Sequence, residues 1–236
     1  MAEEAKKYDL TDLLVMRGDM VRGDSIFCEL PGSMQEIMQI EALLKANKWK
    51  VTPRMGMEGT EESFLSMHSK SPQLLQIATH GFYYTPERAA NVDYLKGYSD
   101  AMMLSGIVLS GGNAAWRGKE LPDGVLGGIL TANNIARLDL SGTEMVVLSA
   151  CQSGQGKATS EGLYGLQRAF KKAGVSHIIV SLWQASDVAT KCFMTNFYAD
   201  LITGSKDVSS AFVFARNCVR TKYPDPSYWA GFVLID

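Results

Sequence analysis

The run Glu144-Met-Val-Val-Leu-Ser-Ala-Cys-Gln-Ser-Gly154 decides how the rest of this chain is interpreted. Its segment from Met145 to Leu148 is short and wholly apolar, which is typical of a strand buried on both faces of a sheet. Small residues follow and place Cys151 just beyond the carboxyl end of that strand. Because α/β sheets bind substrates at this end, the run predicts a thiol at a functional edge.

A second run upstream repeats this arrangement. The segment Leu74-Leu-Gln-Ile-Ala-Thr79 predicts another buried strand that ends at His80, with Gly81 next. A thiol and an imidazole brought together in this way are a candidate nucleophile and base. We therefore predict that the two strands bring His80 and Cys151 together at one edge of the sheet.

Helices and strands alternate along the remaining sequence. Helices are predicted at about 34–46, where Ser33 and Glu36 have capping-box spacing, and from the N-caps Thr60, Thr131, Ser160 and Ser186 and near Val208. Further strands are predicted at 49–51, 177–183 and 229–235, and 82–100 is predicted to be a loop. This alternation predicts an α/β fold in which a mostly parallel central sheet has helices on both faces.

The chain is expected to form a single domain over residues 26–236. Residues 1–25 are polar and charged and are predicted to be an N-terminal arm, although Leu13 to Met16 is compatible with a short strand. With 46% hydrophobic residues, a chain of 236 residues is long enough to bury a sizeable core.

Composition restricts the classes of function. A net charge of -2 provides no broad basic field, so a nucleic-acid partner is not expected. No apolar run approaches the roughly 18 residues that a membrane span requires, and the first residues lack a signal-peptide core. The four cysteines are far apart and, with three histidines, too sparse for a closed metal site, so no metal or other cofactor is expected. We therefore expect a soluble, cytoplasmic protein.

Four blocks of sequence resemble the CHAT domains, which are caspase-like domains often found behind tetratricopeptide repeats. The blocks are Ile77-Ala-Thr-His-Gly-Phe82, Val147-Leu-Ser-Ala-Cys-Gln-Ser-Gly154, Ser181-Leu-Trp183 and Tyr228-Trp-Ala-Gly-Phe-Val-Leu234. The resemblance covers roughly residue 30 to the end and implies a three-layer caspase-like sandwich. Because family members commonly carry further sequence before this part, residues 1–25 are alternatively a truncated start of the family pattern.

The resemblance also implies a function, because the family is related to caspases and separases. It implies a cysteine endopeptidase with a His and Cys dyad, a protein or peptide substrate, and a tetratricopeptide-repeat region or activator protein as a possible partner. In this chemistry Cys151 attacks as a thiolate and His80 is the acid or base. The main-chain N–H groups of Gly81 and Cys151 are the implied oxyanion donors. Gly81 allows close approach because it lacks a Cβ.

Asp187 and Trp183 are the candidate substrate-binding residues. Resemblance to separases, which have an acidic residue in a similar segment, implies that Asp187 pairs with a substrate Arg or Lys. The alternative is a carboxylate at a helix start that interacts with the helix dipole. Trp183 is either a packing residue or a wall of the same pocket.

The sequence is also compatible with other classes of function. A catalytically silent CHAT scaffold that binds other proteins is the main alternative, although both dyad positions are occupied. A nucleotide-binding module is weaker, because a P-loop at Gly156-Lys157 would need Gly at the position of Cys151 and Ser or Thr at that of Ala158. Calcium, which some caspase relatives use, stays open.

Overall fold

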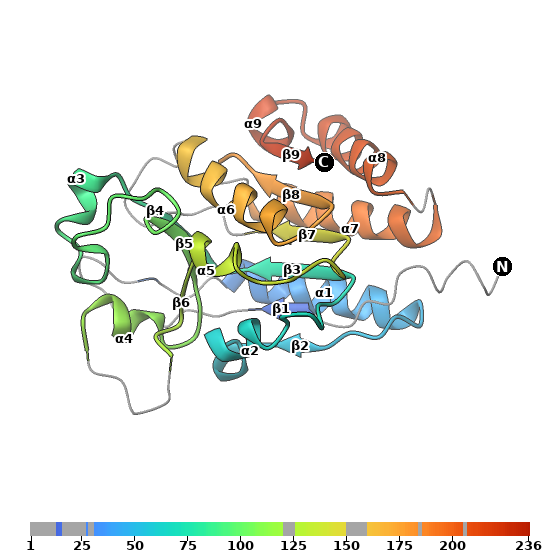
Figure 1. The fold of residues 1–236 in the computed structure, drawn as a ribbon. Helices are drawn as coiled ribbons and strands as arrows, with labels where there is room; N and C mark the ends of the chain where they lie inside the picture. Colours follow the sequence, from blue (N-terminus) through green and yellow to red (C-terminus); the bar gives the residue numbers. More distant parts are fainter. Residues whose placement is uncertain are drawn as a thin grey trace.

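A six-stranded, mostly parallel sheet forms the centre of the protein (Figure 1). The computed structural model describes residues 13–15, 27, 31–119, 126–149, 160–183, 186–204 and 207–236. The sheet has the order β2-β1-β3-β7-β8-β9, with strands β1 (Leu13–Val15), β2 (Pro53–Arg54), β3 (Leu74–Ala78), β7 (Met145–Leu148), β8 (His177–Ser181) and β9 (Phe232–Ile235). Neighbouring strands are parallel except β8 and β9. The predicted mostly parallel α/β sheet is confirmed.

Helices cover both faces of this sheet. Alternate residues of each strand point to opposite faces, so Val146 and Leu148 pack on α5 (Ala132–Ile135) and α6 (Ser160–Lys172). Met145 and Val147 pack on the other face, in the core formed with α1 (Pro31–Ala46), α7 (Asp187–Thr203) and α8 (Val208–Lys222). The fold is thus the expected three-layer sandwich.

A second sheet was not predicted. It is antiparallel, with the order β4-β5-β6, and consists of β4 (His80–Tyr83), β5 (Ser105–Val108) and β6 (Ile129–Thr131). The prediction of a loop over 82–100 was therefore wrong at its start. The remainder holds two short elements, α3 (Pro86–Ala89) and a 3-10 helix, η3 (Asp93–Leu95), and α4 (Gly112–Trp116) follows β5.

The strand predicted to end at His80 ends earlier in the structure, at the turn between the two sheets. β3 ends at Ala78, and His80 is the first residue of β4 rather than the last of β3. Between them, the Thr79 hydroxyl donates a hydrogen bond to the carbonyl of Val108 in β5. The chain therefore leaves the parallel sheet and enters the antiparallel sheet within two residues.

Some predicted boundaries were correct and others were not. Thr60 caps α2 (Glu61–Leu65), Thr131 caps α5 in a capping box, and Ser186 caps α7. By contrast, α1 begins at Pro31, so Ser33 lies inside its first turn and is not the N-cap. The strand predicted at 49–51 is wrong, since the strand in this part of the chain is β2 at 53–54, which is followed by the 3-10 helix η2 (Gly56–Glu58) and by α2. The last strand begins only at Phe232, because α9 (Pro226–Trp229) takes up the preceding residues.

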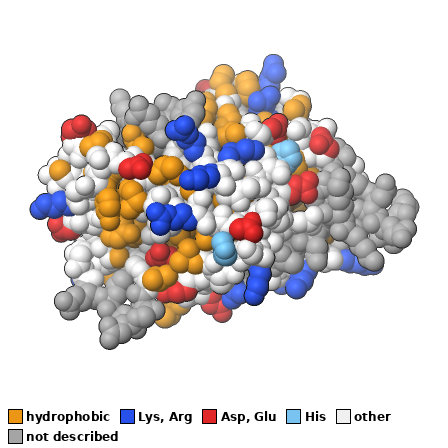
Figure 2. All heavy atoms as spheres, viewed as in Figure 1, with side chains coloured by type: hydrophobic (Ala, Val, Ile, Leu, Met, Phe, Trp, Pro, Cys, Tyr) orange, Lys and Arg blue, Asp and Glu red, His pale blue; other side chains and the backbone are white. Residues whose placement is uncertain are grey.

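The face of the molecule seen in Figure 2 carries both signs of charge and two apolar areas. Figure 2 shows hydrophobic side chains gathered over the three-stranded sheet and over α9, with Lys and Arg side chains over α6. No helix in the described part of the chain is both long and apolar enough to cross a membrane.

The short strand that was an alternative for residues 13–16 is present as β1, which pairs with β2 and β3.

Candidate functional site

His80 lies at the carboxyl end of the parallel sheet, where β3 gives way to β4. Its side chain is buried, with only 6% of the residue exposed. The ring packs beside Phe27, with ring centroids 5.5 Å apart. Phe27 is itself fixed by the side chain of Asn113, which accepts a hydrogen bond from its N–H at 3.0 Å and donates one to its carbonyl at 3.1 Å. One neighbour of the imidazole is therefore an aromatic ring that is itself held in place.

An aromatic cluster supports this region from the β4 side. Trp116 packs against Phe27, Phe82, Tyr84 and Tyr94, with ring centroids between 4.9 and 6.2 Å apart. Burial raises the pKa of Tyr94 to about 12, and the neighbouring carboxyl of Glu61 adds to the shift. The tyrosine is therefore a neutral packing residue at physiological pH, and the cluster holds β4 without adding charge.

The strand register relates His80 to Cys151. Cys151 lies outside the described residues, but the strand that precedes it is described. β3 and β7 are parallel neighbours with Ile77 opposite Leu148, and the N–H of Ser149 continues the ladder to the carbonyl of Ile77 at 2.8 Å. His80 and Cys151 each come three residues after this registered pair. Adjacent strands are only about 4.8 Å apart, so the described segments that lead toward His80 and Cys151 leave the sheet at neighbouring points.

The backbone of Gly81 has a specific orientation. In the β4–β5 ladder the N–H of Tyr84 donates to the carbonyl of Leu104 at 2.9 Å, and Gly81 is opposite Ile107. Antiparallel pairs alternate between hydrogen-bonded and non-hydrogen-bonded positions, so Gly81 is in a non-hydrogen-bonded pair. Its N–H points away from β5, toward the edge of the sheet that no described strand covers. A donor in this orientation can bind a substrate oxygen.

Trp183 is held by the C-terminal part of the domain. Its indole N–H donates to the carbonyl of Ser227 at 2.9 Å, and Leu182 N–H donates to the carbonyl of Gly231 at 2.8 Å. A Cβ at Gly231 would lie 2.8 Å from the Trp183 ring, so only glycine fits there without a shift. Trp183 remains 38% exposed. Two of the sequence blocks that resemble CHAT domains therefore meet here. Trp183 packs against one of them and is also partly exposed to solvent.

Asp187 is the first residue of α7. Ser186 caps this helix by accepting a hydrogen bond from the N–H of Ala189. A carboxylate in this first turn is in the position where the helix dipole favours negative charge. The side chain of Asp187 lies outside the described part of the protein, so its role in a substrate pocket stays a prediction.

A buried polar cluster was missed by the sequence analysis. It consists of Glu36 in α1, Gln76 in β3, Ser149 after β7 and Tyr198 in α7. Gln76 is fully buried in an otherwise apolar strand. A polar residue in such a run is the one signal that predicts a cluster of this kind, because a buried amide must find hydrogen-bond partners.

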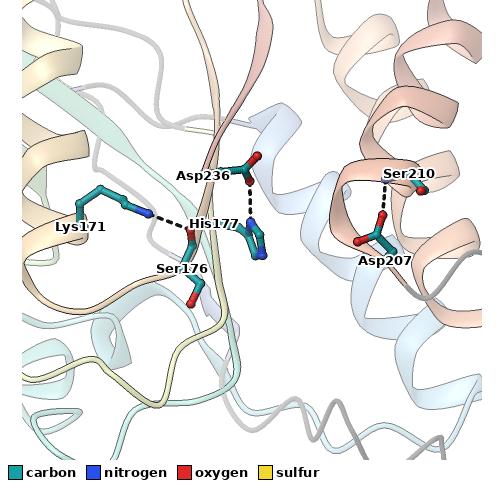
Figure 3. A network of polar contacts seen from close by, with 6 residues as sticks. All are labelled: Lys171, Ser176, His177, Asp207, Ser210 and Asp236. Atoms are coloured by element: carbon teal, nitrogen blue, oxygen red, sulfur yellow. Dashed lines mark hydrogen bonds and ion pairs between the residues drawn. The ribbon is translucent and has the colours of Figure 1, made fainter.

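The other two histidines do not approach this region in the structure. His177 begins β8, at the amino end of the sheet, and its Nδ1 is 2.7 Å from a carboxylate oxygen of Asp236 (Figure 3). His68 follows α2 and accepts a hydrogen bond at Nδ1 from the N–H of Asp139 at 3.0 Å. Among the described side chains, no group of three or more His, Cys, Asp or Glu residues is arranged to hold a metal ion.

This fold is that of the caspase-like cysteine proteinases. One similar solved structure is the Arg-specific cysteine proteinase gingipain R (RgpB), with a TM-score of 0.56 and 11% identity, over 98% of this chain and 47% of that chain. Another is the complex of Porphyromonas gingivalis RgpB pro- and mature domains, with a TM-score of 0.56 and 12% identity, over 98% of this chain and 48% of that chain. At these identities the likeness concerns the fold.

The chain belongs to the CHAT domain family, whose model matches residues 5–236. The matched range includes β1 and confirms the resemblance seen in the sequence. Among curated relatives, tetratricopeptide repeat protein 28 of Mus musculus is 39% identical over 109 residues and that of Homo sapiens is 38% identical over 109 residues. Each alignment covers 45% of this chain and 4% of the relative, so the chain spans only a small part of their length.

Proposed function

We propose that this CHAT domain is a cysteine endopeptidase in which Cys151 is the nucleophile and His80 the general acid and base. The observation that carries the proposal is the β3–β7 register, since both residues come three positions after the pair Ile77 and Leu148. Family membership and the caspase-like fold support the same conclusion.

The proposed reaction uses these groups in sequence. The Cys151 thiolate attacks the substrate carbonyl, and the N–H groups of Gly81 and Cys151 bind the resulting oxyanion. The His80 imidazolium protonates the amine as the C–N bond breaks, which leaves a thioester on Cys151. A water molecule then attacks the thioester while His80 takes a proton from it. The Cys151 thiolate is released as the leaving group, and the second product departs as a carboxylic acid. The orientation of the Gly81 N–H supports its part in this scheme.

Substrate preference is the finer part of the proposal. We assign to Asp187, at the start of α7, the recognition of a basic side chain, so that cleavage follows Arg or Lys. Trp183, exposed at the end of β8 and fixed to Ser227, is the proposed wall of that pocket. A tetratricopeptide-repeat region is the proposed regulatory partner, because curated relatives are named for such repeats.

The test is intact-mass analysis after incubation with peptidyl electrophiles that carry Arg, Lys, Asp or Leu at the recognition position. We expect one adduct at Cys151 that is lost in Cys151→Ala and slowed in His80→Ala. Arg and Lys probes are expected to react fastest, and Asp187→Asn is expected to remove that preference. Modification of Cys192 and Cys218 at the same rate as Cys151, with no dependence on His80, would show that no dyad exists.

A catalytically silent scaffold is the second candidate, and the 6% exposure of His80 favours it. A substrate can reach only a small part of that ring in the described state. If folded protein gives no adduct at Cys151 with or without an added tetratricopeptide-repeat region, the scaffold function replaces the peptidase. An adduct that appears only with the repeats present supports a peptidase that the partner activates.

A further inference from the structure

The buried polar cluster joins four elements of the fold at the carboxyl end of the parallel sheet. The amide nitrogen of Gln76 donates to Glu36 Oε1 at 3.1 Å and to Ser149 Oγ at 3.0 Å. Ser149 Oγ donates to the same oxygen of Glu36 at 2.7 Å, and the Tyr198 hydroxyl donates to Gln76 Oε1 at 2.6 Å. The three hydrogen bonds among Glu36, Gln76 and Ser149 form a closed triangle, and Tyr198 is attached to it through Gln76.

The direction of each hydrogen bond in the cluster is fixed. Burial raises the pKa of the Tyr198 hydroxyl well above its ordinary value, and the charge of Glu36 raises it further, so Tyr198 is a neutral donor. Because it donates to Gln76 Oε1, the Gln76 nitrogen must face Glu36 and Ser149. Ser149 accepts from this nitrogen and can then only donate to Glu36. Oε1 of Glu36 therefore accepts both hydrogen bonds that reach it from the strand segments.

The cluster touches both strands that lead to the proposed dyad. Gln76 lies in β3, four residues before His80, and Ser149 follows β7, two residues before Cys151. Two of the three hydrogen bonds in the triangle cross from one of these strand segments to Glu36, and the third joins the two segments directly. Helix α1 also packs near this end, where Ile37 contacts Ala78 in a small core. The distance between the two strand ends is therefore constrained by side chains as well as by the backbone ladder.

A buried polar cluster of this kind destabilises the fold unless each of its side chains has hydrogen-bond partners. Burying a carboxylate and an amide in the core is unfavourable in the absence of hydrogen-bond partners, and an apolar pair would pack there without this penalty. Its position at the strand ends gives it a use that an apolar pair would not have, because charge-assisted hydrogen bonds are directional and short.

We propose that Glu36 is a positioning residue, which acts through Ser149 and Gln76 to set the separation and orientation of the strand ends that carry Cys151 and His80. The proposal rests on the peptidase function proposed above. Glu36 is on α1, far from the dyad in sequence, and takes no part in the bond changes of the reaction. Its effect is on the geometry of attack, where a displacement of about 1 Å can reduce a rate by roughly 100-fold.

The test compares variants at the two ends of the cluster. Glu36→Gln weakens the triangle by replacing its carboxyl acceptor with an amide, and Ser149→Ala opens it beside the strand ends, whereas Tyr198→Phe removes only the distal hydrogen bond to Gln76. We measure the rate constant for Cys151 modification by an Arg peptidyl electrophile together with the melting temperature of each variant. Glu36→Gln and Ser149→Ala are expected to slow modification by about 10-fold or more. Tyr198→Phe is expected to leave the rate unchanged despite a similar loss of thermal stability. Ser149→Thr, which keeps the hydroxyl, is expected to restore most of the rate.

Two outcomes contradict the positioning role. A rate in Tyr198→Phe that falls as much as in Ser149→Ala would show that the cluster acts only through stability. Unchanged rates in both Glu36→Gln and Ser149→Ala would show that the triangle does not affect the dyad at all.

Failure of the peptidase function is detected separately with His80→Ala. If modification of the wild-type protein does not depend on His80, the dyad proposal fails, and amide hydrogen exchange of the segments 76–81 and 145–151 then decides the positioning role. Faster exchange in both segments of Glu36→Gln and Ser149→Ala, but not of Tyr198→Phe, supports it. Equal exchange in all the variants overturns it.

Discussion

Two histidines at opposite ends of the parallel sheet have contrasting surroundings. His80 follows β3 at the carboxyl end, is buried and lies beside the ring of Phe27. His177 begins β8 at the amino end and is partly exposed, next to the carboxylate of Asp236 (Figure 3). The buried end is built from mutually dependent hydrogen bonds, whereas the exposed end has surface contacts, such as that of His177 with Asp236, that water can replace. Disturbance of the first is expected to be costly, and of the second mild.

The largest expected difference is in reactivity. His80→Ala should slow the modification of Cys151 by a peptidyl electrophile at least about 100-fold, because the general acid and base is lost. His177→Ala should leave that rate unchanged, since this residue lies at the other end of the sheet. Second-order rate constants measured over a range of pH check the prediction, and equal losses in the two variants would contradict it.

A stability difference between the two ends follows from their glycines. A Cβ at Gly106 in β5 would meet the carbonyl of Leu130 and lie 2.8 Å from the Phe82 ring. A Cβ at Gly142, in the turn before β7, would lie 3.1 Å from the Ser71 hydroxyl. Gly106→Ala should therefore destabilise the protein by about 1–3 kcal/mol, and Gly142→Ala by less than about 1 kcal/mol. Urea unfolding measures both changes in stability. A larger loss of stability in Gly142→Ala than in Gly106→Ala would contradict the prediction.

At the amino end, the cap of α8 has a smaller expected effect. The Asp207 carboxylate accepts a hydrogen bond from the N–H of Ser210 at 2.8 Å, and hydrogen bonds from Ser210 lower the pKa of Asp207. Asp207→Ala should cost about 1 kcal/mol, whereas Asp207→Asn retains the cap and should cost less.

The pH dependence of this cap has a definite sign. Because the folded pKa of Asp207 is depressed, its contribution is present above the ordinary value of 3.8 and is lost as the pH falls through the folded value. The difference in unfolding free energy between the wild type and Asp207→Ala should therefore shrink in acid. A difference that is constant with pH would refute this assignment.

Glu61, at the end of the antiparallel sheet that holds His80, should respond to pH in the opposite direction. Burial raises its pKa above 4.5, although its carboxylate accepts a hydrogen bond from the N–H of Gly128 at 3.0 Å. A raised folded pKa means that the contribution is full below the ordinary pKa and is lost as the pH rises through the folded value.

Glu61→Gln keeps an acceptor for Gly128 and cannot titrate. Its stability relative to the wild type should therefore increase between about pH 4 and about pH 7. Urea unfolding of both proteins across this range tests the sign, and a relative stability that decreases with pH would show that hydrogen bonding outweighs burial at this carboxyl.

The sequence predicted the parts of the fold whose signals are local. Continuous apolar runs located β7 and β8, and N-cap residues such as Thr60 and Thr131 located helix starts. The antiparallel sheet had no such signal, since β5 contains Ser105 and Gly106. Gly106 in β5 is explained by the Leu130 carbonyl and the Phe82 ring that pack against it, and both come from neighbouring strands more than twenty residues away in sequence.

Parts of the candidate site could be predicted for the same reason. His80 was placed correctly at the end of the parallel sheet, but the end of β3 was misplaced because the Thr79 hydroxyl finds its partner in β5. Glu36 was interpreted as part of a capping box with Ser33. Its actual partner, Ser149, is separated from it by 113 residues, and such a contact leaves no local pattern in the sequence.

The contact between Trp183 and the segment around Ser227 has a consequence for protein synthesis. These residues are 44 positions apart in the chain. At about 5–20 residues per second, the indole is made roughly 2–9 s before the segment that accepts its hydrogen bond. During that interval β8 has been made without β9, its antiparallel neighbour, and a large aromatic ring is without its packing partner. The nascent chain therefore passes through a stage at which this edge of the sheet is open to chaperones or to other unfolded chains.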